Sequence, residues 1–132
     1  MKVSRTELLE LLTLPGPMNL SNRDLSGSFL ANADLRDWKF QGTKLTGTNL
    51  ITTILTGADF RNANLERAHM QGAQLQGANL EGASLIGAHL EDADFTNANL
   101  NRANLKGAHL EGANLKGTIL SGAIMPDGTK HA

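Results

Sequence analysis

Three histidines recur at an interval of twenty residues and are the side chains best suited to chemistry in this chain: His69, His89 and His109. Glu91 and Glu111 each stand two residues after one of them. Neutral imidazoles that lie side by side can share a divalent metal ion, and they repel one another when they gain protons. A fold that stacks residues twenty apart would give either a metal- or pH-responsive surface or a plain column of exposed side chains. We expect the plain column and assign no metal site.

The sequence offers no arrangement typical of an enzyme. It contains no cysteine, and no serine stands with a histidine and an aspartate in a hydrolase pattern. No phosphate-binding loop, dinucleotide fingerprint or zinc-ligand spacing is present. The formal net charge is −1 without blocks of like charge, which argues against nucleic acid or an anionic membrane as a partner. We therefore expect no catalytic residues and no cofactor.

A repeat of five residues dominates the chain and must set its fold. A large apolar residue, which we call the central residue, occupies every multiple of five from Leu20 to Met125, as 17 Leu, three Phe and two Met. Two residues before it, Ala stands in 14 of the 22 repeats, and most of the others carry Thr or Ser. Two residues after it, at what we call the corner position, Gly stands in 12 repeats and Asn or Asp in seven.

This spacing excludes both a regular helix and a straight strand. Five residues advance by about 500° on an α-helix, so the central residues would spiral around it instead of forming one apolar stripe. On a continuous strand an interval of five would send successive central residues to opposite faces. The interpretation that remains is a short extended segment followed by a corner. The central residue and the small residue point inward, and the residue between them points outward.

The corner composition predicts the turn type. Gly, Asn and Asp tolerate the positive φ that the second central residue of a type II turn requires. We expect positive φ at most corner positions. Thr52, Arg67 and Arg102 should adopt a different turn, because their larger or branched side chains resist that conformation.

Repeated corners coil the chain, so that each extended segment lies beside its equivalent one coil away. The pattern A(N/D)LxG, present as Ala78–Gly82 and Ala113–Gly117, resembles the pentapeptide-repeat family. The resemblance implies an all-β fold, a right-handed quadrilateral β-helix with four repeats in each coil of twenty residues. The repeats would then build a rod on the order of 25 Å tall. The tail 124–129 also resembles the ending of small cyanobacterial members.

The two ends of the repeat need covers, because an open solenoid exposes its core. We expect three segments: a capping helix with a Pro-Gly-Pro turn at 1–17, the β-helix at 18–127 and a tail at 128–132. Ser4 and Glu7 form a capping-box pattern, which predicts a helix from about Arg5 to Thr13. Its leucines cover the first coil or, alternatively, pair with another chain.

Irregular residues gather near both ends. Trp38 is too large for its small-residue position, and Phe29 takes an outward position. We expect both to pack against the cap, with a ligand platform as the alternative. Ile119 and Ile124 also take outward positions, so the carboxy-terminal end is either covered by the tail or joined to another molecule.

Function is expected on the outside or at the ends, because the resemblance implies a narrow, filled interior. We expect a non-enzymatic protein-interaction scaffold, monomeric or dimeric end to end, whose partner is another protein. Some pentapeptide-repeat proteins are acidic DNA mimics that act on type II topoisomerases. That alternative stays open, although residues 20–125 carry ten acidic and nine basic residues. A weak metal- or pH-responsive surface is the third hypothesis.

The expected cellular location follows from two features that the sequence lacks. No stretch approaches the roughly 20 apolar residues of a bilayer-spanning helix, so no membrane partner is expected. The amino-terminal leucines are interrupted by Glu7 and Glu10, and no small-residue cleavage site follows. We expect a cytoplasmic protein.

Overall fold

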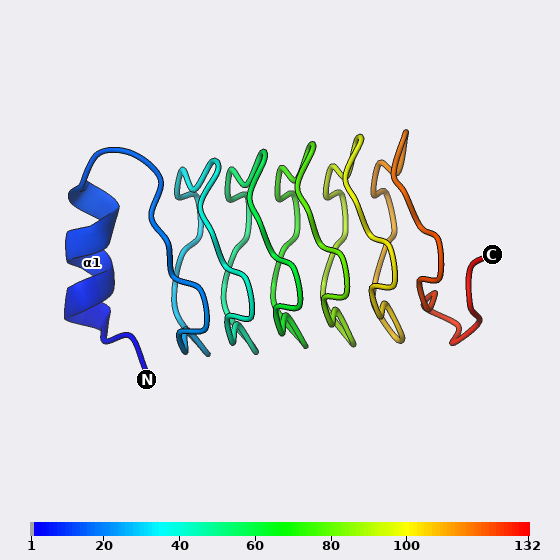
Figure 1. Ribbon diagram of the computed structural model, residues 1–132, viewed down its shortest axis with the longest axis horizontal. Coiled ribbons are helices and arrows are strands. Elements are labelled where there is room, and N and C mark those ends of the chain that lie inside the picture. Colours follow the sequence, from blue (N-terminus) through cyan, green and yellow to red (C-terminus); the bar gives the residue numbers. More distant parts are fainter. Residues whose placement is uncertain (1) are drawn as a thin grey trace.

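The computed structural model describes residues 2–132 and shows a rod of stacked coils with one helix across its amino-terminal end (Figure 1). Helix α1 spans Arg5–Thr13 and is too short to cross a membrane. Extended residues of the coils pair singly, as parallel bridges from Asn19↔Lys39 to Asn104↔Ile124, and no longer strand occurs within 2–132. The fold is the expected right-handed quadrilateral β-helix with a capping helix.

The backbone of each repeat bonds to the coils on both sides. In the repeat centred on Leu80, the amides of Leu80 and Gly82 donate to carbonyls of the next coil at 2.7 and 2.9 Å. The amide of Ala83 closes the turn by donating to the carbonyl of Leu80 at 3.0 Å, and the amide of Ser84 donates to the preceding coil at 3.0 Å. This pattern satisfies four amides of every five, as a buried backbone requires.

In repeats with Asn or Asp before the central residue, that side chain satisfies the fifth amide, which belongs to the residue after the central one. The Oδ1 atom of Asn79 accepts a hydrogen bond from the amide of Glu81 at 3.1 Å, and Asp94 accepts one from the amide of Thr96 at 2.9 Å. The Thr96 hydroxyl, together with that amide, lowers the pKa of Asp94 because hydrogen bonds favour its charged form. The Asn or Asp of the repeat pattern therefore has a structural role that the sequence analysis missed.

Side chains fill the interior of the rod. The central residues from Leu35 to Leu105 are fully buried, and the rings of Phe40 and Phe60 stack with their centroids 4.9 Å apart. Threonine can replace alanine at the small-residue position because its buried hydroxyl has a hydrogen-bond acceptor. Thr43 Oγ1 donates to the carbonyl of Leu20 at 2.8 Å. These coils contain no internal space large enough for a substrate.

The corners confirm most of the predicted turns and correct part of the prediction. Gly82 has a φ of 70°, and its counterparts in the other coils are similar. Thr52, Arg67 and Arg102, for which another turn was predicted, also have positive φ, at 55°, 57° and 57°. Their amides donate to the next coil like those of the glycines, for example Thr52 to the carbonyl of Gln71 at 2.9 Å. Stacking therefore imposes a left-handed conformation that costs these residues about 1–2 kcal/mol each.

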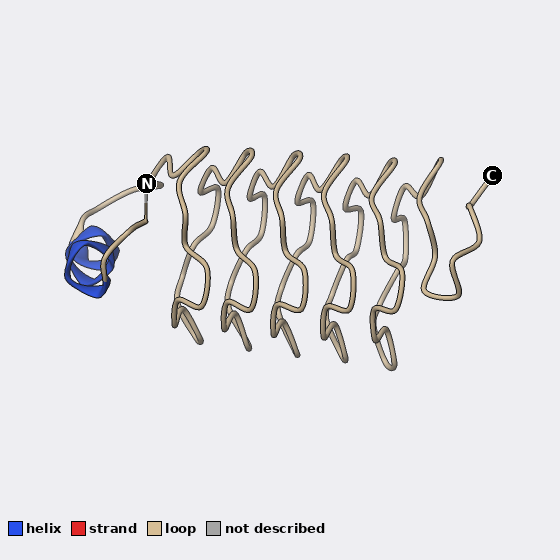
Figure 2. Ribbon diagram, turned by 90° about the horizontal axis from the view of Figure 1, so that it is seen from below, coloured by secondary structure: helices blue, strands red, loops and turns tan. Residues whose placement is uncertain are grey.

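Helix α1 closes the first coil, as predicted, and lies across the rod axis in both views (Figures 1 and 2). Ser4 begins the helix by accepting a hydrogen bond from the amide of Glu7 at 3.0 Å, and Val3 and Leu8 are buried in the core. The other half of the capping box is absent. Glu7 instead binds Arg23 at 3.0 Å, which explains why arginine stands at a small-residue position of the first coil.

The two aromatic residues expected under the cap differ in their burial. Trp38 is buried, stacks on Phe40 at 6.1 Å and lines a groove together with Leu12 and Leu14, as predicted. Phe29 is 59% exposed, so the prediction that it packs under the cap is wrong. The residue before the central one always points out of the coil, and this geometry outweighs the apolar character of Phe29.

The carboxy-terminal tail turns back onto one side of the last coil. Lys130 forms an antiparallel bridge with Ile124, and the amide of His131 donates to the carbonyl of Ala123 at 2.7 Å. Leu110 and Leu115, on the other sides of the same coil, are only partly buried. The boundaries at residues 17 and 127 stay a prediction, and Met1, which belongs to the predicted cap, lies outside the described residues.

Candidate functional site: the histidine face

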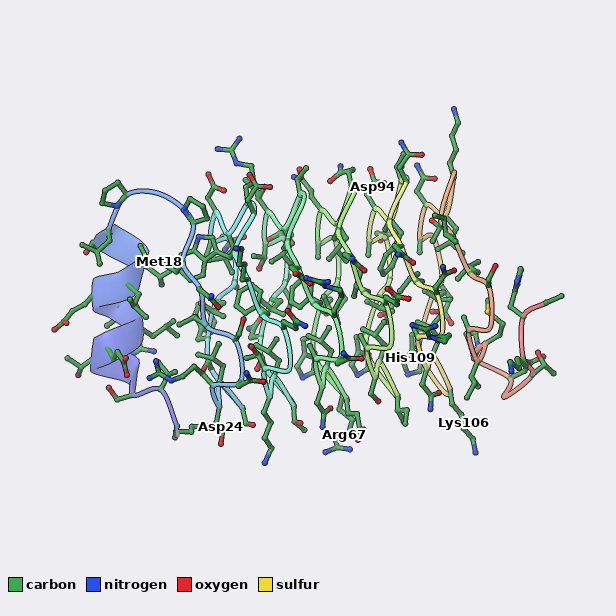
Figure 3. All side chains as sticks on the ribbon, viewed as in Figure 1. Met18, Asp24, Arg67, Asp94, Lys106 and His109 are labelled. Carbon is green, nitrogen blue, oxygen red and sulfur yellow. The ribbon has the colours of Figure 1, made fainter. Side chains whose placement is uncertain are left out.

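Five repeats stack to form the side of the rod that carries the histidines. They are centred on Leu30, Leu50, Met70, Leu90 and Leu110, and we call their outward surface the histidine face. Its outward column runs Phe29, Asn49, His69, His89 and His109, joined by successive parallel bridges. In Figure 3, His109 lies between Asp94, at the upper edge, and Lys106, at the lower edge.

The three histidine rings are stacked, as their spacing predicted. The ring centroids of His69 and His89 lie 5.0 Å apart with an angle of 3° between the planes, and those of His89 and His109 lie 4.8 Å apart at 8°. A metal ion needs its ligand nitrogens at about 2.0–2.1 Å, converging on one point, whereas parallel rings place them side by side. Residues 2–132 contain no group of three or more histidines and carboxylates arranged to hold a metal. The expectation of a plain column without a metal role stays a prediction.

Two acceptor oxygens on this face have no hydrogen-bond donor. Oε1 of Glu91 and Oε1 of Gln71 are both buried and unpartnered. The other carboxylate oxygen of Glu91 lies 3.8 Å from Nδ1 of His89, too far for a hydrogen bond. A carboxylate oxygen removed from water without a donor costs free energy, so this part of the face favours the approach of a donor or a cation.

The family follows from the repeat. A model of the pentapeptide repeats matches this chain with eight copies over residues 19–50, 44–82, 53–92, 73–112 and 88–125. The chain belongs to the pentapeptide-repeat family. No curated protein matches its sequence.

Solved structures of pentapeptide-repeat proteins share the fold. The protein Rfr23 of the cyanobacterium Cyanothece 51142 is 28% identical, with 76% of this chain and 86% of that one covered and a TM-score of 0.67. A pentapeptide-repeat protein of Nostoc PCC 7120 is 29% identical, with 89% and 75% covered and a TM-score of 0.51. QnrB1, a plasmid-mediated fluoroquinolone resistance protein, is 21% identical with 83% and 73% covered, and its TM-score of 0.45 supports no conclusion about function.

On the other sides of this pentapeptide-repeat rod, several carboxylates pair with arginines. Asp34 pairs with Arg36 at 2.7 Å and Asp59 with Arg61 at 2.7 Å. The Arg61 guanidinium, by hydrogen bonding, holds the pKa of Asp59 below its usual value. Because solvent reaches the arginine of each pair, each pair contributes at most about 1 kcal/mol. None of the five repeats of the histidine face contains Lys or Arg, so its carboxylates lack such partners.

Proposed function

We propose that this pentapeptide-repeat protein is a non-enzymatic scaffold that binds another protein through the outer surface of its rod. The main observation in support of this proposal is that side chains fill the interior of the rod. Central residues such as Leu80 and Phe95 are fully buried, and the small residues beside them leave no room for a substrate. The chemically distinctive side chains lie outward, on flat sides built from stacked columns, where a second protein can reach them.

The surroundings of the histidines support a non-catalytic role. A catalytic histidine is normally held within hydrogen-bond reach of a nucleophile and of a group that orients it. Within residues 2–132, the side chains of His69, His89 and His109 make no hydrogen bond, and the one carboxylate within ion-pair distance of a ring nitrogen is that of Glu91, 3.8 Å from Nδ1 of His89. Their regular stacking follows from the coil repeat, which needs no active-site explanation.

The charge of the rod weighs against action on a topoisomerase as a DNA mimic. Such a role needs an acidic surface that imitates phosphates, and between residues 20 and 125 the ten acidic residues are offset by nine basic ones. The structure adds that Asp34, Asp59 and Glu81 are paired with arginines. We therefore place the scaffold first. Whether the rod acts as a monomer or as an end-to-end dimer belongs to the same proposal.

Photo-cross-linking from each side of the rod tests the scaffold function. A photoreactive amino acid is introduced singly at Glu81, Lys106, His89 and Thr96, one for each side, and each variant is exposed in an extract of the native host. We expect one discrete protein to be cross-linked from one side and not from the opposite side. Absence of a specific product from all four positions would contradict the proposal.

A further inference from the structure

We propose that the histidine face docks a short segment of a partner protein that carries an apolar side chain at one end and Lys or Arg at the other. This inference rests on the proposed scaffold function and names the side of the rod and the chemistry of the partner. The face has two unlike ends. Its amino-terminal end is apolar with basic residues beside it, and its carboxy-terminal end is acidic.

The acidic end comprises Glu91, Asp92 and Glu111, which stand in the last two repeats of the face. In the described chain none of these carboxylates forms an ion pair with Lys or Arg, in contrast to Glu81, which Arg102 binds at 2.5 Å. Unpaired carboxylates gathered on one surface attract cationic side chains and disfavour anionic partners. The acidic end thus specifies the charge of the segment that docks there.

Glu91 marks where a cationic donor would gain most. Its Oε1 atom is buried without a donor, while the side chain as a whole is 35% exposed, so a partner can contact the exposed part of the carboxylate group. A hydrogen bond from a guanidinium or ammonium group to a carboxylate is among the strongest that proteins make. Arginine suits this place because its planar fork can bind Glu91 and still reach Glu111 or the neighbouring amide oxygen of Gln71.

The apolar end comprises Phe29 and Ile51. Phe29 is 59% exposed and borders a groove of about 240 Å³ whose walls include Val3 and Leu8. An exposed aromatic ring beside a groove is the kind of feature that anchors protein interfaces. A leucine or phenylalanine of the partner would enter this groove and cover the ring.

Basic residues fix the direction of the segment. Lys2 and Arg5 line the same groove as Phe29, so they repel Lys and Arg from the apolar end. The carboxylates lie at the opposite end of the column, near His109. From Phe29 to His109 the column climbs four coils, about 19 Å at the usual strand spacing. A helix of about 13 residues spans that distance, with the flat histidine stack beneath the half that carries the cationic residues.

The experiment uses the full chain and three synthetic peptides. The first is a capped 14-residue Ala/Gln helix with two leucines at one end and four arginines at the other. The second has the same composition with leucines and arginines intermixed, and the third replaces the arginines with glutamates. Backbone amide NMR spectra of the labelled protein report both affinity and location. We expect the first peptide to shift signals of the histidine face and to bind more tightly than either of the others.

Matched variants decide which side chains are responsible. Glu91→Gln combined with Glu111→Gln should weaken binding of the first peptide by about tenfold, since close charge pairs contribute that much to an interface. Phe29→Ser should weaken it as well, whereas Glu66→Gln, on a neighbouring side, should leave it unchanged. All are surface substitutions, and thermal melts confirm that each variant is folded.

The docking proposal is overturned if the first peptide does not bind, if the intermixed peptide binds equally well, or if shifts appear on other sides. Affinity that is unchanged in the Glu91/Glu111 variant overturns it too. These outcomes leave the scaffold function standing if photo-cross-linking captures a partner from another side. The scaffold function fails separately, when no side captures a partner.

Discussion

The two ends of the rod are built from the same repeat and are closed in different ways. At the amino-terminal end, α1 lies on the first coil, and the central residues Leu20 and Leu25 are 2% and 0% exposed. At the carboxy-terminal end, the central residues Leu110, Leu115 and Leu120 are only partly buried. A central leucine is thus buried by its neighbouring coils on both sides, and an end coil needs a separate device to replace the missing neighbour.

The backbone shows the same difference. The amide of Leu25 donates to the carbonyl of Lys44 at 2.7 Å, and the carbonyl of Asp24 accepts from Val3 at 2.8 Å, so the first coil is bonded on both sides there. In the last coil, no described residue accepts a hydrogen bond from the backbone amides of Leu110 and Leu115. The tail bonds the coil from Gly122 to Met125 and leaves the rest of its edge open.

The largest difference in stability between the two ends should appear when a central leucine is replaced by aspartate at each of them. Leu25→Asp buries a carboxylate between α1 and the second coil, which costs several kcal/mol and should unfold the amino-terminal half. Leu115→Asp places it where water has access, and should cost less by about 2 kcal/mol or more. Thermal melts of both variants check this, with Glu81→Ala as a surface control. Equal melting temperatures for the two aspartate variants would refute the contrast.

Deleting the segments that close the two ends should have the second-largest effect on stability. Deletion of residues 1–17 exposes the first coil and removes the burial of Val3 and Leu8, worth about 1.5–3 kcal/mol for each side chain. We expect self-association by size-exclusion chromatography and a lower melting temperature. Deletion of residues 128–132 removes few buried groups and should change both properties much less. A truncated chain without residues 1–17 that stays monomeric and equally stable would show that α1 is not a cap.

The ion pair that ties α1 to the first coil should matter less. Arg23 and Glu7 are one-third and two-fifths exposed, so solvent screens their attraction. Glu7→Gln should lower stability by at most about 1 kcal/mol, and the loss should shrink as salt is added. Chemical denaturation at low and high salt measures this. The matched change Glu111→Gln, at the other end, should have no salt-dependent effect on stability.

Acid should loosen the repeats that contain Asp24 and Asp34 before those that contain Asn104 and Asn114. Hydrogen bonds from Ser26 lower the pKa of Asp24, and those from Arg36 lower the pKa of Asp34. Because the folded-state pKa lies below the ordinary value of 3.8, each carboxylate stabilises the fold above about pH 4, and this contribution is lost as the pH falls. Asn104 and Asn114 make the equivalent turns near the other end and do not titrate.

Amide exchange followed between pH 5 and pH 3 measures this smallest effect. After correction for intrinsic exchange rates, protection should fall first around Asp24 and Asp34, and Asp34→Asn should retain protection around its own repeat. An equal loss of protection around Asn114 would contradict the assignment.

The fold could be predicted from sequence because one geometric rule repeats. An interval of five with small, large and corner residues is compatible with one coil, so the inward side and the stacked histidines followed from it. The helix from Arg5 to Thr13 followed separately from the capping pattern of Ser4 and Glu7. The turn at Thr52 was predicted wrongly because local preference was weighed without the hydrogen bonds that adjacent coils impose on it. Phe29 was misplaced because its apolar character was given more weight than its outward position.

The candidate site was only partly visible in the sequence. The histidine spacing predicted the column, but the repeat pattern gave no sign that Arg23 pairs with Glu7, sixteen residues away across the cap. The unpartnered oxygen of Glu91 depends on rotamers that spacing does not determine. Grouping the repeats by side would have shown that one side lacks Lys and Arg, because residues twenty apart share a side.

Amide hydrogen exchange along the whole chain tests most directly whether the rod is closed at one end and open at the other. We predict slow exchange at Leu80, nearly equal protection at Leu25 beneath α1, and exchange at Leu110 and Leu115 faster by at least about a thousandfold, since these last two amides lack acceptors. Protection at Leu115 equal to that at Leu80 would contradict the account and show that the last coil is covered like the first.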